Sequence, residues 1–501
     1  MRSRSVQLLS DTLCYSVGLV LRRGISIITL PVFTRYLSVQ EFGVLSIIST
    51  VRELLSVLFE WGIPNSSARF YYDCRTDEER RRLFGTLFLF IMAASFAGCA
   101  LLVWVGPLYW NRFVLNVPFH PYISLTIVTV FLLGMGILPR TLFRVTGRVP
   151  LHTALGVGEG VLTAGLSIAL VTIGNFGVMG PVLGNLGACL SFFFIFFTFL
   201  RSEIAWAFSP HVLGRSLAFG LPEIPVRMAS WALKLADRLI LQAYLPLSVV
   251  GLYSVGYLLG GTVFELIASS LNSAILPFFY LTATQESEQA SRRIFADVAA
   301  YNAALLGFLG LGTILFAREF IVIFTTSQYQ EAETVVPLVA WASIFQALAH
   351  IPNRAIYLAK KTAVLPVVFI APAALNVGLN IVLIPRYGMI GAAWATLASY
   401  PILFGLTLMA AQRIYHIPYD YWRMAKPLVL ALTLSLLKGL IPAELMMTAL
   451  SVKALVLCAF PFALILSGFV TGKERTALQR LAIDVMSRPA VLPKRLERTH
   501  E

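Results

Sequence analysis

The stretch "YLSVQEFG", residues 36–43, recurs as "YLPLSVVG" at residues 244–251. This repeat indicates how the helices of the chain are organised. The two copies share the tyrosine–leucine pair and the final glycine at a shift of 208 residues. Two further blocks recur in the same order with similar shifts, 171–180 with 382–391 and 138–144 with 351–357. Three blocks in order indicate two related halves, because weak internal symmetry of this kind marks repeated membrane bundles.

Long apolar stretches fill nearly the whole chain. Of its 501 residues, 58% are hydrophobic and only 13% are charged, whereas soluble domains carry about 25% charged residues. Windows of about 20 residues, the length of one helical membrane crossing, give about fourteen stretches. They lie at 14–34, 42–64, 83–106, 121–143, 152–174, 178–200, 217–244, 248–277, 294–317, 334–357, 364–384, 388–411, 425–441 and 446–471. The sequence therefore predicts an all-α integral membrane protein.

The repeat predicts how these helices are organised. Its shift covers about six stretches, so both halves enter the membrane in the same direction, as parallel repeats do. We expect a six-helix bundle at 1–210, a second at 211–415, two additional helices at 416–472 and a basic tail at 473–501. In carriers built from two bundles a central cavity lies between them, and rocking of the bundles alternates access to it.

Basic residues are distributed unevenly among the connectors. The chain has a net charge of +14, and its lysines and arginines gather in alternate loops. With the N-terminus inside, most of them are cytoplasmic, as the positive-inside rule requires. Both termini are then expected to be cytoplasmic, and the charge reflects membrane topology rather than nucleic-acid binding. Arg22 and Arg23 interrupt the first apolar run, so we expect a retained helix and not a cleaved signal peptide.

Ionisable side chains lie within the predicted spans, where each costs about 2.5–3.5 kcal/mol if it faces lipid at mid-bilayer. The bases are Arg22, Arg23, Arg52, Arg140, Arg227, Lys234 and Arg238, and the acids are Glu53, Glu60, Glu223, Asp237 and Glu265. Their summed cost exceeds the stability of a typical protein, so they must face protein or a water-filled cavity. The four charged residues between 227 and 238 share one side of their helix.

Polar stripes also run along the stretches that are equivalent in the two halves. Glu53 and Glu60 align on 42–64, and Glu265 lies on 248–277. We therefore expect the stripes to face a common cavity with a slight excess of bases. Two structural alternatives stay open. Lys234 and Asp237 could neutralise each other at i, i+3, and Arg22 or Arg140 could extend towards a membrane face.

Motifs for catalysis and for metal binding are absent from the sequence. The segment "GFVTGKERT", 468–476, has the wrong glycine spacing for a P-loop and Glu474 where serine or threonine is needed. The five cysteines have no paired spacing, so no disulfide, metal site or cofactor is expected. We expect a transporter that does not hydrolyse ATP, and not an enzyme.

Three segments carry a resemblance to a known family. They are "ITLPVFTRYLSVQEFGVLSI" at 28–47, "ADRLILQAYLPLSVVGLYSVGYLLG" at 236–260 and "NIVLIPRYGMIGAAWATLAS" at 380–399. They resemble the polysaccharide-transporter branch of the multidrug/oligosaccharidyl-lipid/polysaccharide exporter superfamily, which contains the Wzx-type flippases of O-antigen and capsule repeat units. The resemblance covers essentially the whole chain, including the count of fourteen spans.

This resemblance implies that a polyprenyl-pyrophosphate-linked oligosaccharide is moved from the cytoplasmic to the outer leaflet of the inner membrane, among membrane lipids. Arginine forms bidentate contacts with phosphate. The expected contacts to pyrophosphate or to acidic sugars are Arg22, Arg23, Arg227, Lys234 and Arg238, with Arg52 and Arg140 as weaker candidates. Trp231, Asn376 and Asn380 are sugar-contact candidates. Asp237, Glu53, Glu60 and Glu265 are expected to form gating ion pairs or to couple transport to H⁺ or Na⁺. A polysaccharide polymerase and glycosyltransferases are the implied protein partners.

Other functions compete with this interpretation. A peptidoglycan lipid-precursor flippase shares the expected span count and a cationic cavity. An ion-coupled multidrug exporter of the same superfamily would favour an acidic cavity. A membrane polymerase or ligase of the pathway usually needs a large external loop, and the connectors here are short. The paired polar stripes argue against a scaffold that transports nothing.

Overall fold

The computed structural model describes residues 2–114, 116–285, 287–359, 361–440, 446–470 and 474. The regular elements in these ranges are all helices, as the apolar pattern predicts. Two compact units are formed. Unit 1 holds Met1–Ala299 and Thr313–Tyr419, and unit 2 holds Ala300–Gly312 and Asp420–Glu501.

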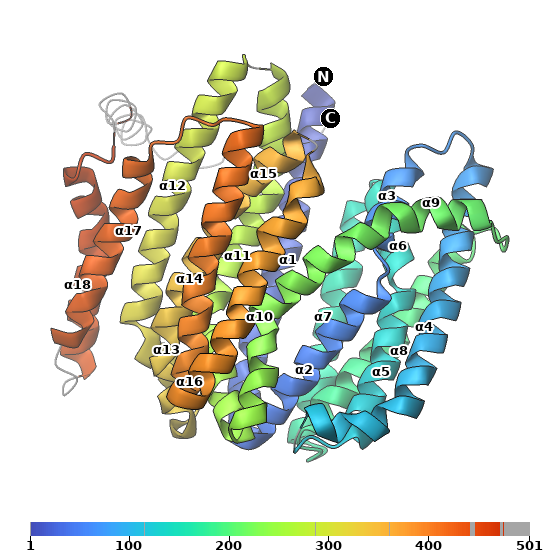
Figure 1. Ribbon diagram of the computed structural model, residues 1–501, viewed down its shortest axis with the longest axis horizontal. Helices are drawn as coiled ribbons and strands as arrows, with labels where there is room; N and C mark the ends of the chain where they lie inside the picture. The colour runs from blue at the N-terminus through green and yellow to red at the C-terminus, as the bar shows by residue number, and fades with distance from the viewer. Residues whose placement is uncertain are drawn as a thin grey trace, which may run out of the picture. The chain divides into compact units, whose positions relative to one another are not determined.

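Unit 1 contains the helices of both predicted halves, except that Ala300–Gly312 of α12 belongs to unit 2. The first half gives α1 (Arg2–Tyr36), α2 (Val39–Phe59), α3 (Ile63–Tyr71), α4 (Asp77–Phe113), η1 (Phe119–Ile123), α5 (Ser124–Met135), α6 (Ile137–Val145), α7 (Val149–Thr172) and α8 (Met179–Leu200). The second half gives α9 (Pro210–Gly220), η2 (Leu221–Glu223), α10 (Ile224–Tyr244), α11 (Leu247–Gln285), α12 (Glu288–Leu315), α13 (Ala317–Phe324), η3 (Ser327–Thr334), α14 (Val336–Leu348), α15 (His350–Leu358), η4 (Thr362–Val364) and α16 (Leu365–Ile414). In Figure 1, α4 to α8 gather on one side and α11, α14 and α16 on the other, and α2 and α10 pack together where the two groups meet.

Both copies of the repeated stretch form a break between two helices. In the first copy, the Ser38 backbone N–H donates to Glu41 Oε2 at 2.8 Å, and the Glu41 N–H donates to Ser38 Oγ at 3.2 Å. This capping box starts α2. In the second copy, Pro246 keeps Leu245 extended, at φ −134° and ψ 156°, and so ends α10.

The glycines that close the two copies lie against each other. A Cβ at Gly43 would lie 1.9 Å from the carbonyl oxygen of Leu247, and one at Gly251 would lie 2.2 Å from that of Val39. The α2 and α11 backbones are therefore in direct contact, which only residues without a side chain allow. One turn further along, the Ser46 and Ser254 hydroxyls are 2.6 Å apart and 208 residues apart in sequence, the repeat shift. Equivalent residues thus meet at this contact, while the division at 210/211 stays a prediction because both halves lie within unit 1.

The expected count of fourteen membrane spans is not confirmed. Among the described residues, ten helices are long and apolar enough to cross a membrane, or up to eleven if the bent pair Ser327–Thr334 and Val336–Leu358 is one span. The helices α10 and α17 (Tyr421–Leu436) are not among these ten. The first carries four charged residues, and the second has only 16 residues. The stretches 364–384 and 388–411 merge into α16, although Gly388 at φ 60° and ψ −139° breaks its helical geometry. The chain is a multi-pass membrane protein, and the count of fourteen is not confirmed.

Unit 2 combines part of α12 with α17, η5 (Leu437–Leu440) and α18 (Met446–Leu466). Arg423 is buried here. Its Nη2 donates to both Glu474 carboxylate oxygens at 2.7 and 2.8 Å, and its Nε donates to the Phe469 carbonyl at 3.1 Å. Glu474, the residue that breaks the P-loop pattern, is therefore held in an ion pair. The predicted tail 473–501 otherwise lies outside the described residues.

Candidate functional site

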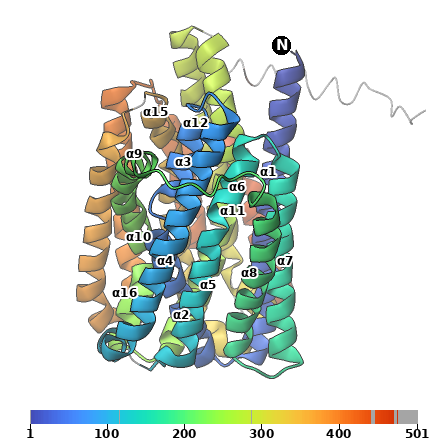
Figure 2. The same ribbon diagram turned by 90° about the vertical axis from the view of Figure 1, so that its right-hand side faces the viewer.

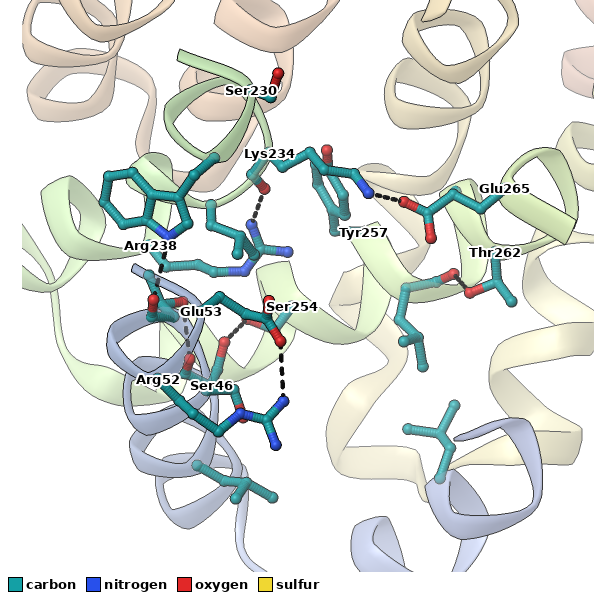
Figure 3. Close-up of a pocket in the computed structure, with 18 of the residues that line it drawn as sticks. Ser46, Arg52, Glu53, Ser230, Lys234, Arg238, Ser254, Tyr257, Thr262 and Glu265 are labelled. Carbon is teal, nitrogen blue, oxygen red and sulfur yellow. Dashed lines mark hydrogen bonds and ion pairs between the residues drawn. The ribbon is translucent and has the colours of Figure 1, made fainter. Parts of the chain in front are cut away.

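A cavity of about 640 Å³ lies within unit 1 between helices of both halves. Its lining comes from α1, α2, α10, α11 and α14. The charged residues among the lining are Arg52, Glu53, Arg227, Lys234, Arg238 and Glu265. The volume falls within the usual range for small-molecule sites, about 300–1,000 Å³, and Figure 3 shows how several of these side chains point into it.

The helix α10 forms the most basic wall of the cavity. Arg227, Lys234 and Arg238 all line it, as the helical projection predicts. The Lys234 ammonium pairs with the Glu265 carboxylate on α11 (Figure 3). Arg227 Nη1 lies 2.5 Å from Glu60 Oε2, just after the last residue of α2. The first pair therefore stays within the second half, whereas the second pair joins the two halves.

Arg238 is held by a buried network behind the cavity. Only 6% of Arg238 and 1% of Asp237 are exposed. Arg238 Nη1 donates to Asp237 Oδ1 at 2.8 Å and to the Lys234 carbonyl at 2.7 Å. Its guanidinium carbon lies 5.5 Å from the ring centre of Tyr253 and 4.4 Å from that of Tyr257, and the Tyr253 hydroxyl donates to Asp237. Two ring contacts and a charge-assisted hydrogen bond fix the guanidinium in place.

On the opposite wall, α2 contributes one basic side chain. Arg52 Nη2 donates to Glu53 Oε1 at 3.1 Å, and both residues line the cavity. Trp231 on α10 lines it too, and its Nε1 donates across to the Thr50 carbonyl of α2 at 3.1 Å. The indole therefore connects α10 and α2 by one hydrogen bond.

Each base of the lining has a carboxylate partner. The pairs are Arg52–Glu53, Arg227–Glu60, Lys234–Glu265 and Arg238–Asp237. Two of these carboxylates, Glu60 and Asp237, stand outside the lining itself. The predicted slight excess of bases thus holds for the lining alone, because counting the partners makes the charge of the cavity balanced.

Other residues predicted to contact the ligand do not line this cavity. Arg140 Nη2 donates to both oxygens of Glu159 on α7 at 2.7 Å, and its guanidinium lies 4.9 Å from the ring centre of Phe196. Arg22 packs against α7, where a Cβ at Gly156 would lie 3.3 Å from its Nη1. The side chain of Arg23 lies outside the described part of the chain. Arg22 and Arg140 thus pack against helices of the first half.

Of the sugar-contact candidates, only Trp231 lines the cavity. Asn376 and Asn380 are fully buried in α16, and Asn380 Nδ2 donates to Asn376 Oδ1 at 3.0 Å. A pair of amides bonded to each other inside the helix packing does not face a ligand. These two residues are therefore structural in this conformation.

Several residues of the site were not found from the sequence. Tyr253 and Tyr257 are spaced i, i+4 and so share one face of α11, but nothing in the sequence connects that face with Arg238. Glu159 was missed because it stands alone in an apolar stretch. Ser254 was detectable, because it lies one repeat shift from Ser46.

Comparison with solved structures finds the same architecture. The lipid II flippase MurJ in an inward closed conformation aligns with a TM-score of 0.74 at 14% identity, over 90% of this chain and 98% of that one. The MATE transporter VcmN of Vibrio cholerae aligns with a TM-score of 0.56 at 13% identity, over 82% and 97%. A MOP superfamily transporter from Pyrococcus furiosus gives 0.57 at 12% identity, over 84% and 98%. These similarities show a shared transporter fold.

Comparison with curated proteins finds no match. A family model described as "Polysaccharide biosynthesis protein" matches residues 32–334, which is more than half of the chain. The match includes both copies of the repeated stretch and the charged residues of α2 and α10 that line the cavity. The resemblance found in the sequence is thereby confirmed. The chain belongs to the polysaccharide biosynthesis protein family and has the fold of MOP superfamily transporters.

Proposed function

We propose that the chain is a flippase that translocates a polyprenyl-pyrophosphate-linked oligosaccharide across the cytoplasmic membrane by alternating access. In this proposal both termini are cytoplasmic, and the product serves polysaccharide biosynthesis such as that of O-antigen. Membership of a polysaccharide biosynthesis family supports the substrate class. The step makes and breaks no covalent bond, so no catalytic residue is required.

The observation that carries the proposal is the set of bases in an otherwise apolar membrane protein. Arg52, Arg227, Lys234 and Arg238 converge on one cavity of about 640 Å³. A pyrophosphate head group needs cationic donors, and a guanidinium presents two parallel N–H groups to a phosphate. The volume accommodates a head group, whereas the polyprenyl tail is apolar enough to stay in the bilayer beside it.

The ion pairs suggest how binding and release alternate. Every base in the lining is already paired with a carboxylate, so an entering pyrophosphate competes with these carboxylates for the bases. The pair Arg227–Glu60 joins the two halves, and its exchange for the ligand would free them to rock. Re-formation of the pairs would then expel the ligand on the far side. The carboxylates freed in this cycle, Glu53, Glu60 and Glu265, are the groups we propose for coupling to H⁺ or Na⁺.

A second candidate is a flippase for a peptidoglycan lipid precursor. The similarity to the lipid II flippase MurJ favours it, with a TM-score of 0.74 against 0.56 for VcmN. Both candidates carry a lipid pyrophosphate and require the same bases. A multidrug exporter of cations fits less well, because the lining itself holds four bases and only two carboxylates, Glu53 and Glu265.

Removal of charge at Lys234 and Arg227 tests the proposal. Lys234→Gln and Arg227→Gln are each expected to lower translocation at least about tenfold, because each loses a charge-assisted contact of about 1.5–3 kcal/mol. Translocation is measured in vesicles as loss of access of a membrane-impermeant glycosidase to a lipid-pyrophosphate-linked oligosaccharide. The matched control is Arg69→Gln, which removes an arginine of an exposed pair with Asp73. Undiminished translocation in both cavity variants would refute the assignment, and movement of lipid II alone would favour the second candidate.

For the pair Arg140–Glu159 we expect an effect on stability and not on translocation. Arg140→Gln is expected to lower the free energy of unfolding by about 1–3 kcal/mol, because Glu159 is only 8% exposed and loses its partner. Translocation per folded molecule is expected to stay near that of the wild type, since Arg140 does not line the cavity. Thermal unfolding in detergent and the vesicle assay measure the two effects. A selective loss of translocation at unchanged thermal stability would place Arg140 among the ligand contacts after all.

A further inference from the structure

A small recess with polar side chains in its wall lies beside the cavity, between α2, α5 and α8. It has a volume of about 30 Å³ and shares Leu45, Ser49 and Arg52 with the cavity lining. Beyond them it reaches Thr126 and Thr129 on α5 and Asn185 on α8, two helices that lie side by side (Figure 2). Its volume is close to that of one water molecule in the liquid, about 30 Å³, so it accommodates one small polar group.

The recess places hydrogen-bond acceptors next to donors. Thr126 and Thr129 are 3% and 2% exposed. The Thr126 hydroxyl donates to the Tyr122 carbonyl of η1 at 2.8 Å, and the Thr129 hydroxyl donates to the Leu125 carbonyl of α5 at 2.9 Å. A hydroxyl whose proton is used in this way still offers its lone pairs. Arg52 supplies the donors, because its contact to Glu53 occupies one of the five N–H groups of a guanidinium.

We infer that this recess is a subsite for one hydroxyl or hydroxymethyl group of the carbohydrate carried by the lipid, an inference that rests on the proposed function. A sugar hydroxyl both donates and accepts, so it can donate to Thr126 or Thr129 and accept from Arg52. A carboxylate or phosphate oxygen only accepts, and it would meet the threonine oxygens with like partial charge. The two threonine acceptors therefore favour a sugar hydroxyl, which can use them and the Arg52 donors together, over an anionic oxygen, which can use only the donors.

The subsite also orients the substrate within the cavity. Two of the bases proposed for the pyrophosphate, Lys234 and Arg238, lie on α10. The recess is lined by residues of α2, α5 and α8. A ligand bound at both places spans the cavity from the second half to the first. Arg52 lines the cavity and the recess together, so its guanidinium can contact the sugar substituent in the recess and the head group in the cavity. A lipid-linked sugar that lacks this hydroxyl would leave buried polar atoms of the recess unpaired. Unpaired buried polar atoms let a binding site reject such an analogue strongly.

Threonine-to-valine substitutions test the subsite, because valine keeps the shape of threonine and removes its hydroxyl. The double variant Thr126→Val/Thr129→Val is compared with the wild type in vesicles that contain a lipid-pyrophosphate-linked oligosaccharide. We expect the half-saturating lipid concentration to rise about tenfold, the effect of losing one buried hydrogen bond, while the maximal rate stays unchanged. The conservative variant Thr126→Ser/Thr129→Ser keeps both acceptors and should restore the wild-type value.

The matched control is Thr407→Val, which removes an equally buried hydroxyl that donates to its own helix at Leu403, in α16 and outside the cavity. This control should leave both kinetic values unchanged. An unchanged half-saturating concentration in the double valine variant, a fall of the maximal rate alone, or an equal rise in the control would each overturn the subsite. Failure of the wild type to translocate the lipid would instead refute the proposed function, so the two failures are distinguishable.

Discussion

Alanine at Gly43 is expected to separate α2 from α11 and to destabilise the protein by about 3 kcal/mol or more. The new methyl group would lie 1.9 Å from the Leu247 carbonyl oxygen and 2.8 Å from its carbon. Both atoms belong to the backbone, so no change of rotamer relieves the clash, and overpacking of this kind costs about 1–3 kcal/mol even where side chains can adjust. Thermal unfolding in detergent should show a clear decrease in Tm, and translocation in vesicles should fall more than tenfold.

Other glycines of the same unit provide the controls for this effect. Gly165 in α7 and Gly378 in α16 have nothing within 4 Å of an added Cβ. Alanine at these positions should leave Tm unchanged or raise it, because alanine favours a helix over glycine by about 1 kcal/mol. Gly251→Ala, on the partner helix, should reproduce the effect at Gly43. Equal Tm values for the Gly43 variant and these controls would show that α2 and α11 do not touch.

Asparagine at Asp237 is expected to have the second large effect. Arg238 and Asp237 are almost fully buried, and breaking a buried ion pair by removing one partner costs about 3–5 kcal/mol. The Tyr253 hydroxyl also loses the charge that it donates to. We expect a lower Tm and a loss of translocation. Measuring both for the single variants Asp237→Asn and Arg238→Gln establishes the cost of an unpaired charge.

The double variant Asp237→Asn/Arg238→Gln separates stability from transport. Two neutral amides leave no unpaired charge in the network, so most of the lost thermal stability should return. Translocation should not return, because the guanidinium that lines the cavity is absent. Full recovery of both properties would show that Arg238 serves only the fold. A double variant as unstable as the singles would show that the network depends on shape rather than charge.

Much of the fold could be predicted from periodicity alone. The repeat at 36–43 and 244–251 falls where the structure has two helix breaks, but the contact between its closing glycines was not predicted. Apolar length identified membrane helices, but it divided α16, which continues through Gly388, into two stretches. Length and hydropathy describe single helices, whereas the limits of a span also depend on how its neighbours pack.

The site could be predicted only in part, for a similar reason. The face of α10 that lines the cavity follows from helical geometry within one segment. The partner of each charge depends on how different helices are rotated against each other, which no single segment reveals. Arg140 was therefore grouped with the cavity bases, although Glu159 holds it on α7. The balance of charge was missed for the same reason, since Glu60 and Asp237 reach their partners from outside the lining.

In the proposed transport cycle, the contact at Gly43 and Gly251 is the point about which α2 and α11 turn against each other. It is made of backbone atoms, so the two helices can rotate there but no side-chain movement can change the distance between them. From Gly43 to Glu60 the helix forms a lever arm of about 25 Å, at about 1.5 Å per residue. A tilt of about 10° at the glycines would displace the far end by about 4 Å, more than the 2.5 Å that joins Glu60 to Arg227. A rotation of this size would therefore break the Arg227–Glu60 ion pair at the far end of α2.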